Sequence, residues 1–418
     1  MKTQLSLGYG RTTQTFAFDD QQFVVLRDIS NAERPLTDLE IGSALDNPID
    51  SAPLNELFTP AESVLIVVSD ATRATGSAQV VNLLVRRLIQ SGVGPADIAI
   101  IFATGIHRRV TEDEKRELLT PFIAQRIRTI DHDPHSGLFS LDMKVGNQAV
   151  ELNVALRQFS HVIITGAIGF HYFAGFTGGR KSICPGIASA PTIEATHMLA
   201  LDFETGGRRA GVATGKLDGN AVSEACEAIA AVVSPAFNIN CVVDQKGRVT
   251  RMYAGHWKTS HRKGCEDYLQ THSVDIAAPR KQVIVSCGGW PWDINMIQAH
   301  KAIEMAAHAT AEGGTIVLLA ECEDGLGRAD FLKWFQERNS KALASRLREG
   351  YEVNGQTAWS LMSKAERYRI ILISRLPDEE VRTMGMQPAH SLTEVTSNEP
   401  GFVLPRGAAL LPVVKNES

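Results

Sequence analysis

A strand, a helix and a second strand follow one another early in the chain, and this order constrains the fold more than any other feature. Residues 63–70 form an apolar run that ends in polar residues, which predicts a buried parallel strand. Residues 79–90 repeat apolar side chains at helical spacing until Ser91-Gly92 stops the pattern. A second apolar run covers residues 97–102. This β-α-β order predicts a parallel sheet with a right-handed crossover.

The same alternation returns in the second half of the chain. A polar connector is expected at residues 271–281, and an apolar strand at 283–287 follows it directly. A helix is expected from Asp293 to Glu312, with Asp293 as its cap. Further apolar strands are expected at 315–320 and 368–374. A second α/β unit is therefore predicted here.

The length of the chain agrees with this division, because 418 residues exceed one ordinary core. We predict an α/β protein of two domains with largely parallel sheets and an active site in the cleft between them. The N-terminal domain is expected at residues 1–272 and the C-terminal domain at 280–392. The apolar tail, residues 395–418, is expected to pack back on the first domain.

Charge and cysteine usage exclude several classes of partner. The net charge is −5 and no run rich in Lys or Arg occurs, so neither nucleic acid nor an anionic membrane is expected to bind. We find no signal peptide pattern and no apolar run long enough to span a bilayer, which favours a cytoplasmic protein. The six cysteines show no C-x-x-C pair and indicate buried thiols. A small molecule is the expected ligand.

Polar side chains follow three of the predicted strands. Asp70 and Arg73 come after the first strand, His107 after the second, and His171 after a strand at residues 161–165. In open α/β sheets, ligands bind at the edge where the strands end. Arg73 suits a carboxylate or a phosphate, although Asp70 could simply cap a turn and pair with Arg73. Two histidines at this edge suggest a pair of general acid/base groups, although each alone is equally well explained as structural.

The segment from His171 to Gly186 is rich in glycine and carries a lysine. Gly178 and Gly179 allow a turn whose N–H groups could bind an anion, so a phosphorylated ligand is expected. The phosphate-binding pattern G-x-x-x-x-G-K-[ST] does not fit, because Arg180 separates Gly179 from Lys181. This misfit argues against an NTPase.

Two further pairs are candidates for ligand binding. Glu194 and His197 lie three residues apart on a predicted helix, and one neutral imidazole can bind nickel, copper or zinc but does not make a metal site alone. Gln298 and Lys301 have the same spacing and could point across an interdomain cleft, or could form a solvated helix face.

Taken together, these segments resemble the nickel-dependent lactate racemase family. The segments that carry the resemblance are Asp70-x-x-Arg73, Ala103-Thr-Gly-Ile-His107, His171-x9-Lys181 with Gly-Gly-Arg-Lys-Ser-Ile-Cys-Pro-Gly, His197, and Gln298-x-x-Lys301. The matches occur in order from about residue 60 to residue 305, and the glycine-rich block is highly specific.

The resemblance implies a cofactor and a reaction. The cofactor is a nickel-pincer nucleotide of the pyridinium-3,5-bisthiocarboxylic acid mononucleotide type, covalently attached at Lys181, with His197 as the metal ligand. The implied enzyme is an isomerase, a racemase or epimerase that inverts C2 of a 2-hydroxy acid by hydride transfer to and from this group. Cofactor-maturation enzymes are the implied partners, and a homodimer is one expected assembly.

The resemblance also distributes roles among the other residues. His107 and His171 would be the bases on the two faces of the substrate. Arg73, Gln298 and Lys301 would hold the substrate carboxylate. Asp70, Gly178 and Gly179 would help to position the cofactor or its phosphate.

One departure from the family pattern leaves the identity of the substrate undecided. The family places a tryptophan directly after a glutamine in the last third of the chain, whereas here Thr357 follows Gln356 and Trp359 is shifted. The substrate can be lactate-like, malate, an aryl-lactate or a sugar acid. Trp290 and Trp292 could shape the pocket or pack between domains.

Two other functions compete with the racemase. A nicotinamide-dependent or nicotinamide-independent 2-hydroxyacid oxidoreductase suits the fold class, but no G-x-G-x-x-G follows a predicted strand. A non-catalytic nucleotide-binding module is the other alternative, and the presence of both His107 and His171 argues against it.

Overall fold

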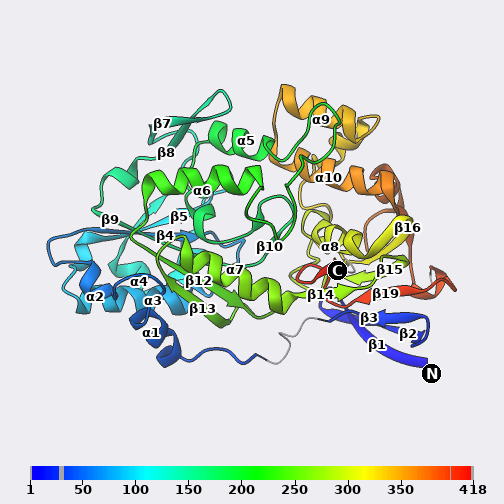
Figure 1. Cartoon of the computed structure of the whole chain (residues 1–418), viewed down its shortest axis with the longest axis horizontal. Helices are drawn as coiled ribbons and strands as arrows, with labels where there is room; N and C mark the ends of the chain where they lie inside the picture. The colour runs from blue at the N-terminus through cyan, green and yellow to red at the C-terminus, as the bar shows by residue number, and fades with distance from the viewer. Residues whose placement is uncertain (1, 28–32, 396, 416–418) are drawn as a thin grey trace. The chain divides into compact units, whose positions relative to one another are not determined.

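The computed structural model describes residues 2–27, 33–395 and 397–415, which form two compact units (Figure 1). We call residues 32–200 and 210–268 the central unit, and residues 1–31, 201–209 and 269–418 the terminal unit. The chain therefore leaves the central unit and returns to it within nine residues. Within the described ranges, no helix is both long and apolar enough to cross a bilayer.

The central unit is built on a six-stranded sheet in the order β13-β12-β9-β4-β5-β6. Neighbouring strands are parallel except for β12 and β13, which are antiparallel. The strands are β4 (Val64–Ser69), β5 (Ile98–Ala103), β6 (Arg128–Asp131), β9 (His161–Ala167), β12 (Phe237–Val243) and β13 (Val249–Gly255). The expected β-α-β unit is confirmed, since α3 (Ser77–Gln90) joins β4 to β5.

Helices, two small hairpins and a turn complete the central unit. The helices are α1 (Asp38–Asp46), α2 (Leu54–Leu57), α4 (Glu112–Arg126), α5 (Ala190–Met198), α6 (Ala221–Val233) and α7 (Thr259–His272), of which the last ends in the terminal unit. The hairpins are β7 (Leu138–Val145) with β8 (Gln148–Asn153), and β10 (Phe170–His171) with β11 (Gly175–Phe176). A 3-10 turn, η4, covers Gly179–Ser182.

The central strand β4 explains why this sheet is covered on both faces. Its five residues from Val64 to Val68 are fully buried. Alternate side chains of a strand point to opposite faces. Accordingly, Val64, Ile66 and Val68 belong to one hydrophobic cluster, whereas Leu65 and Val67 belong to the other. An uninterrupted apolar run is thus the sequence that two buried faces require.

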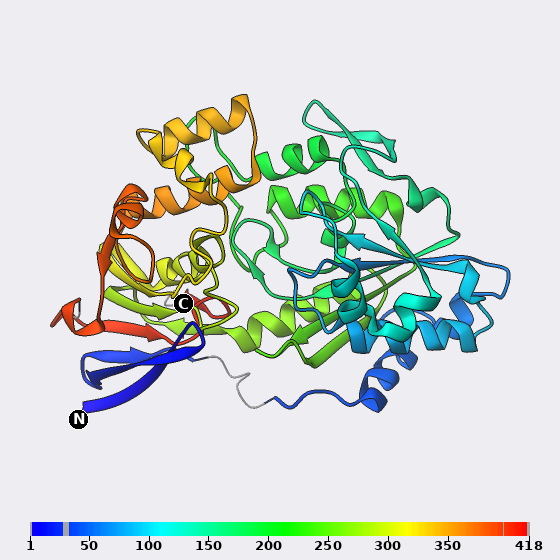
Figure 2. The same cartoon turned by 180° about the vertical axis from the view of Figure 1, so that it is seen from behind.

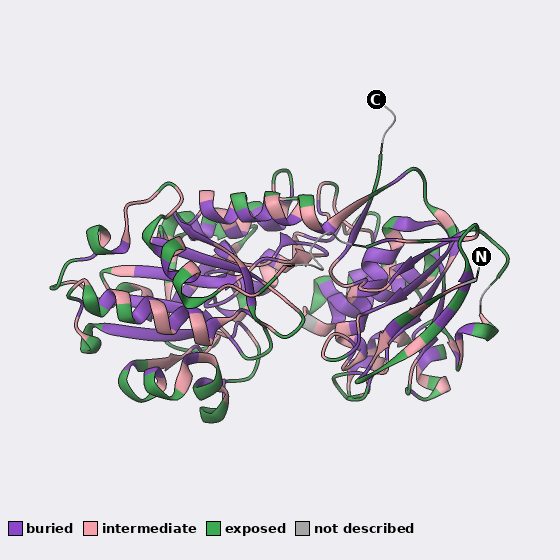
Figure 3. Cartoon of the chain, turned by 90° about the horizontal axis from the view of Figure 1, so that it is seen from below, coloured by how far each residue is buried: buried purple, intermediate pink, exposed green. Residues whose placement is uncertain are grey.

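The terminal unit has its own six-stranded sheet, in the order β18-β17-β16-β15-β19-β3, and all of its pairings are parallel. Its strands are β3 (Phe23–Val25), β15 (Arg280–Ser286), β16 (Thr310–Leu319), β17 (Arg369–Ile373), β18 (Gln387–Ala389) and β19 (Gly401–Leu404). The helices are α8 (Met296–Ala309), α9 (Ser340–Glu349), α10 (Val353–Arg367) and α11 (Asp378–Thr383). In Figure 3 the strands of each unit are mostly purple, as expected for buried sheets.

Both ends of the chain belong to the terminal unit, so the domain boundaries expected from the sequence need correction. The tail belongs to the terminal unit, where β19 pairs with β15 and also with β3, a strand that the sequence assigned to the first domain (Figure 2). Gly401 explains the close fit, since a Cβ there would lie 2.3 Å from the Phe23 ring. The N-terminal hairpin, β1 (Lys2–Tyr9) with β2 (Thr12–Asp19), is part of the same unit.

Two local predictions in this unit are also wrong. The connector expected at 271–281 contains β14 (Ser273–Ile276), which pairs with β20 (Leu411–Val414). The helix expected from Asp293 to Glu312 is shorter, because Thr310 already belongs to β16.

The cap of α8 is Asn295 rather than Asp293. The Asn295 side chain accepts a hydrogen bond from the backbone N–H of Gln298. The Asp293 carboxylate instead accepts from the backbone N–H groups of Gly10, at 2.7 Å, and Glu321, at 3.1 Å. Asp293 therefore joins the N-terminal hairpin to the end of β16, a long-range role that local sequence does not reveal.

Candidate active site

Three neighbouring strands of the central sheet deliver the predicted polar residues to one edge. Asp70 follows β4 directly, His107 lies four residues beyond β5, and His171 lies in the hairpin that follows β9. Because β4 pairs in parallel with both β5 and β9, the carboxyl ends of these strands share an edge. The arrangement expected from the sequence is confirmed for these residues.

A hydrogen bond joins Asp70 to His107. Asp70 Oδ2 lies 2.7 Å from Nδ1 of His107, while Oδ1 accepts hydrogen bonds from the backbone N–H and the hydroxyl of Thr72. Burial opposes ionisation, but the contacts with His107 and Thr72 and the charge of Arg73 outweigh it, so the pKa of Asp70 is lowered. The Asp70 side chain is 5% exposed and the His107 side chain 43% exposed. A neutral His107 therefore carries its proton on Nδ1 and presents Nε2 to a ligand.

His171 has the opposite hydrogen-bonding pattern. Its Nδ1 accepts from the backbone N–H groups of Ala174, at 3.2 Å, and Phe173, at 3.4 Å. The hairpin places His171 opposite Gly175, and the ring stacks on Tyr172. A neutral His171 in these contacts carries its proton on Nε2.

Lys181 lies in the 3-10 turn η4 as a partly buried amine. Its Nζ is 5.7 Å from the centre of the Phe173 ring. Burial, together with the positive charges of Arg73 and Arg180, lowers the pKa of Lys181 to about 7. Near neutral pH a large fraction of this amine is therefore unprotonated, which is the nucleophilic form.

His197 lies in the last turn of α5. Burial lowers its pKa to about 3, with additional contributions from the charges of Lys181 and His107. The ring is therefore neutral at physiological pH, which is the form that binds metals. Glu194, its predicted partner one turn earlier, lies on the same helix.

One side chain that sequence reasoning missed, Phe173, connects the predicted residues. Its ring centre lies 4.4 Å from that of His171 and 5.1 Å from that of His197, and Lys181 Nζ lies over it. The structure thus brings His171, Lys181 and His197 around one aromatic ring. A phenylalanine carries no titratable or metal-binding group, so the sequence alone does not mark it as part of a site.

Asn240 and His261, which sequence reasoning also missed, pack against the glycine-rich turn. The N–H of Gly179 donates a 2.8 Å hydrogen bond to Oδ1 of Asn240. A Cβ on Gly178 would lie 2.4 Å from that same oxygen, and one on Gly179 would lie 2.5 Å from Cγ of His261. Close packing therefore demands both glycines, whereas their contact with a phosphate stays a prediction. The available signal was the presence of two polar residues, Asn238 and Asn240, in the otherwise apolar and mostly buried strand β12.

Arg180 fastens this turn to the rest of the unit. Its guanidinium is buried and donates to the carbonyl oxygens of Ala174, at 2.8 Å, and Ser223 on α6, at 3.4 Å. Ala174 is also the residue whose N–H meets His171. Arg180, the residue that breaks the phosphate-loop pattern, thus links the turn that carries Lys181 to the hairpin that carries His171.

His132 lies between two aspartates, at residues 131 and 133, yet its side chain is buried. Its Nε2 meets the carbonyl of Ala188 at 3.0 Å, and Nδ1 meets the Asn153 amide at 3.1 Å. It is therefore a core histidine with both nitrogens satisfied.

In the terminal unit, Gln298 and Lys301 share a face of α8, as expected. Lys301 Nζ donates a 2.6 Å hydrogen bond to Oε1 of Gln298, and both side chains are partly buried. Thr357 and Trp359 lie on α10, where Trp359 is buried and donates from Nε1 to the carbonyl of Gly206 at 3.0 Å. Trp359 thus anchors the segment 201–209.

Comparison with known proteins identifies the family. The family model described as the lactate racemase N-terminal domain matches residues 9–206, and the model of the lactate racemase C-terminal domain matches residues 276–400. A lactate racemase of Lactiplantibacillus plantarum is 32% identical over 333 residues, which covers 78% of this chain and 77% of that protein. The chain belongs to the lactate racemase family. It is therefore a racemase, an isomerase by reaction class.

Further relatives agree with membership of the lactate racemase family. A lactate racemase of Thermoanaerobacterium thermosaccharolyticum is 29% identical over 401 residues, covering 93% of this chain and 92% of that protein. The structure of the lactate racemase apoprotein from the same organism has a TM-score of 0.88 at 27% identity, over 98% of this chain and all of that one. A crystal structure of a Thermotoga maritima protein, 19% identical with a TM-score of 0.69 over 92% of this chain and all of that one, shares the fold.

Proposed function

We propose that this racemase inverts C2 of a 2-hydroxy acid and that it carries a nickel-pincer nucleotide bound covalently at Lys181. The observation that carries the proposal is the grouping of Lys181, His197 and His171 around Phe173. A reactive amine, a neutral imidazole and a proton-transfer group are the three functions that such an enzyme requires from the protein.

The donor set of the central unit fits this cofactor. Across the ranges that the structure describes, no three His, Cys, Asp or Glu side chains are grouped to hold a metal. A metal at His197 would therefore take its other ligands from a bound group, as a pincer with two sulfur arms and one carbon would provide. The amine of Lys181, with its pKa of about 7, suits bond formation to a carboxylic or thiocarboxylic arm. When bound, the group supplies a reversible acceptor for the hydrogen on C2.

Two histidines supply the proton chemistry. Racemisation requires a base on each face of the substrate carbon, because the hydroxyl proton leaves on one side and returns on the other. His107 presents an unprotonated Nε2, and the Asp70 carboxylate holds its ring in that form. His171 presents Nε2–H while its Nδ1 accepts from Ala174 and Phe173, so it is a hydrogen-bond donor to a substrate oxygen until these contacts are exchanged.

The remaining residues bind the substrate carboxylate or position His107 and the cofactor. Arg73 is exposed next to Asp70, and its guanidinium matches a carboxylate in a two-pronged contact. In the terminal unit, Gln298 and Lys301 are the residues that we propose for carboxylate binding, with the Gln298 amide fixing the lysine. Asp70 would orient His107 besides helping to position the cofactor, and Gly178 with Gly179 would shape the floor below the cofactor. The expected cytoplasmic location and partnership with cofactor-maturation enzymes belong to the same proposal.

Production of the chain together with nickel-pincer maturation enzymes tests this function. Intact mass should increase by the mass of one nucleotide and metal analysis should find nickel. Lys181→Ala should lose the adduct, and His197→Ala should keep the adduct with less nickel. His107→Gln and His171→Gln should keep both and lose turnover. An unmodified chain without nickel under these conditions would contradict the proposal.

The substrate is tested on the same preparation. Chiral chromatography after incubation with lactate, malate, aryl-lactates and sugar acids measures inversion at C2 directly. The replacement of the family tryptophan by Thr357 removes aromatic surface from α10, which supports a substrate larger or more polar than lactate. Inversion of lactate alone would contradict that part.

A further inference from the structure

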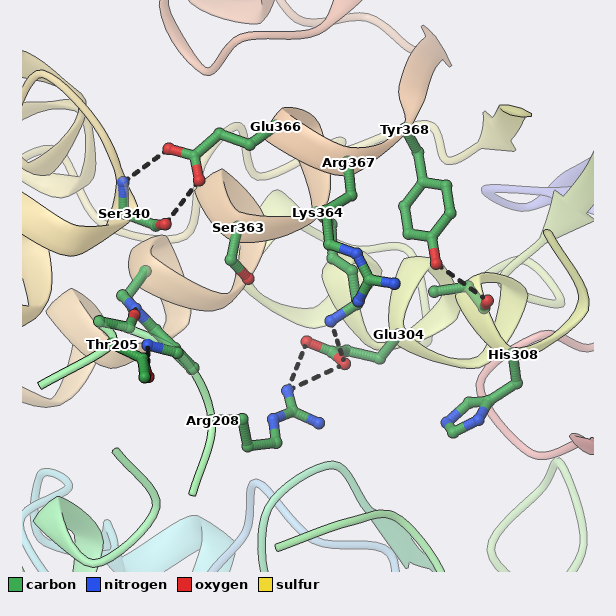
Figure 4. Close-up of a pocket in the computed structure, with 14 residues that line it drawn as sticks. Thr205, Arg208, Glu304, His308, Ser340, Ser363, Lys364, Glu366, Arg367 and Tyr368 are labelled. Carbon is green, nitrogen blue, oxygen red and sulfur yellow. Dashed lines mark hydrogen bonds and ion pairs between the residues drawn. The ribbon is translucent and has the colours of Figure 1, made fainter. Parts of the chain in front are cut away.

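Two buried charges in this chain are stabilised in different ways. In the terminal unit, the side chain of Glu304 lines a cavity, is 2% exposed and forms ion pairs with Arg208 and Lys364 (Figure 4). In the central unit, Arg180 is also 2% exposed. The charge of Glu227 favours the ionised form of Arg180, but Glu227 forms its ion pairs with two other cations. Among the described residues, uncharged groups therefore hold the Arg180 guanidinium through hydrogen bonds.

Two backbone carbonyls accept from the Arg180 guanidinium. Nη2 donates to the oxygen of Ala174 at 2.8 Å, and Nε donates to the oxygen of Ser223 at 3.4 Å. Nη1 lies 3.4 Å from Nε2 of His261, but that nitrogen also lies 3.0 Å from the carbonyl oxygen of Thr177. Burial lowers the pKa of His261 to about 3, so the ring is neutral. Since a carbonyl can only accept, Nε2 of His261 carries the proton, and the short bond to Ala174 is the main attachment of Arg180.

Three consecutive carbonyls at the tip of the His171 hairpin accept hydrogen bonds from outside the hairpin. The donor and acceptor residues are Asn220 and Phe173 at 3.0 Å, Arg180 and Ala174 at 2.8 Å, and Gly215 and Gly175 at 3.0 Å. These bonds fix the backbone of the tip, whose N–H groups at Phe173 and Ala174 donate to Nδ1 of His171. Of the three donors, Arg180 alone is charged, and a charge-assisted hydrogen bond is roughly twice as strong as a neutral one.

We propose that Arg180 is a positioning residue for the racemase reaction and that it keeps the proton of His171 on Nε2. By fixing Ala174, Arg180 keeps the backbone N–H groups on Nδ1, so Nε2–H is the donor toward a substrate oxygen. The inference rests on the proposed role of His171 and explains how this histidine comes to differ from His107. A carboxylate, that of Asp70, holds the proton of His107 on Nδ1, whereas Arg180 acts on His171 through the backbone of the hairpin.

NMR of the full chain, labelled at histidine and free of cofactor, tests the proposal. At a pH where the rings are neutral, their carbon and nitrogen shifts report which nitrogen carries the proton, and His171→Gln identifies the signals of His171. In the parent chain we expect the Nε2–H form of His171 and the Nδ1–H form of His107. Arg180→Gln should lower the Nε2–H fraction of His171 by roughly twofold or more, because Ala174 loses its charged donor. The His107 signals should not change.

Two further variants separate positioning from a structural role. Arg262→Gln is the matched control, because it removes an arginine of α7 that pairs with Asp218 and Glu227, and it should leave the signals of both histidines as in the parent. Arg180→Lys keeps the charge but has a shorter reach, so the Nε2–H fraction should fall by less than in Arg180→Gln. If Arg180→Gln does not fold, Arg180→Lys is compared with the parent alone.

The outcomes are distinct from those that test the cofactor, since the measurement needs neither adduct nor turnover. A purely structural role of Arg180 would lower the melting temperature and leave the proton of His171 on Nε2. An unchanged His171 in both folded variants, or in Arg180→Lys when only that variant folds, would overturn the proposal. An Nδ1–H form of His171 in the parent chain would also overturn it.

Discussion

Oδ2 of Asp70 accepts a 2.7 Å hydrogen bond from Nδ1 of His107, so the two histidines of the site are not equivalent. His107 offers an unprotonated Nε2, whereas the backbone contacts of His171 place its proton on Nε2. An enzyme that inverts a stereocentre needs matched chemistry on both faces, yet this structure provides two different environments. Substitutions that act on one histidine at a time can measure this difference between His107 and His171.

Removal of the Asp70 charge should impair the reaction without loss of the cofactor. Asp70→Asn keeps the volume but no longer fixes the His107 tautomer, so the turnover number should fall by on the order of 10²-fold. Intact mass should still show the adduct at Lys181. Thr72→Ala, which removes only one hydroxyl contact to Asp70, is the matched control and should cost much less. Equal loss in both variants would argue that Asp70 acts on turn geometry alone.

Each histidine should serve one enantiomer in a single turnover. His107→Gln is expected to stop formation of the 2-keto acid from one enantiomer, and His171→Gln from the other, because each oxidation needs a base on one face. Rapid quenching with each pure enantiomer, followed by quantification of the keto acid, measures both. His256→Gln changes an exposed histidine and should have no effect. Loss of both enantiomers in both single variants would contradict the assignment of faces.

The lowered pKa of Lys181 predicts that this residue destabilises the cofactor-free fold to an extent that depends on pH. The native state resists protonation of this amine, whose pKa falls from 10.5 to about 7 on folding. The loss of folding free energy is largest below pH 7 and decreases to zero as the pH rises toward 10.5. Lys181→Met should therefore stabilise the chain more at pH 6 than at pH 10, by on the order of a few kcal/mol. Urea unfolding at several pH values measures this difference, and a gain that does not vary with pH would contradict the shift.

The glycine turn predicts a specific steric defect. Gly179→Ala places a Cβ 2.5 Å from Cγ of His261, whereas Gly146→Ala, at a similar positive φ, meets nothing within 4 Å. Both substitutions place a side chain on a left-handed backbone, which destabilises each variant. The difference between their free energies of unfolding therefore measures the clash, which should cost about 1–3 kcal/mol. The free energy of unfolding in urea gives both values. Adding His261→Ala should recover part of the loss in Gly179→Ala and none in Gly146→Ala.

Local patterns were sufficient for part of the fold. The apolar run of β4 and the helical spacing of α3 define a β-α-β unit, and the parallel pairing of β4 with β5 follows from it. The same logic placed Asp70, His107 and His171 at one sheet edge. These inferences succeed because strand burial and crossover handedness depend on neighbouring residues.

Long-range pairing could not be predicted in the same way. The tail β19 is as apolar as any internal strand, and only packing against Phe23 and β15 reveals which sheet receives it. Asp293 looked like a helix cap because its carboxylate stands near a helix start, but its partners are the Gly10 and Glu321 amides. Phe173 gave no chemical signal in the sequence, since an aromatic ring acquires its role from the side chains around it.

The terminal unit is assembled from three separate stretches of chain, which matters to anyone who wishes to exchange substrate specificity between relatives. A graft of residues 276–400, the segment that matches the C-terminal family domain, would import α8 and α10 but leave behind β3 and the Gly206 carbonyl that Trp359 binds. Arg208 would also remain foreign to its Glu304. A chimera that carries residues 2–27, 201–209 and 401–415 along with the graft keeps β3, β19 and β20 with their partners and should fold where the simpler exchange fails.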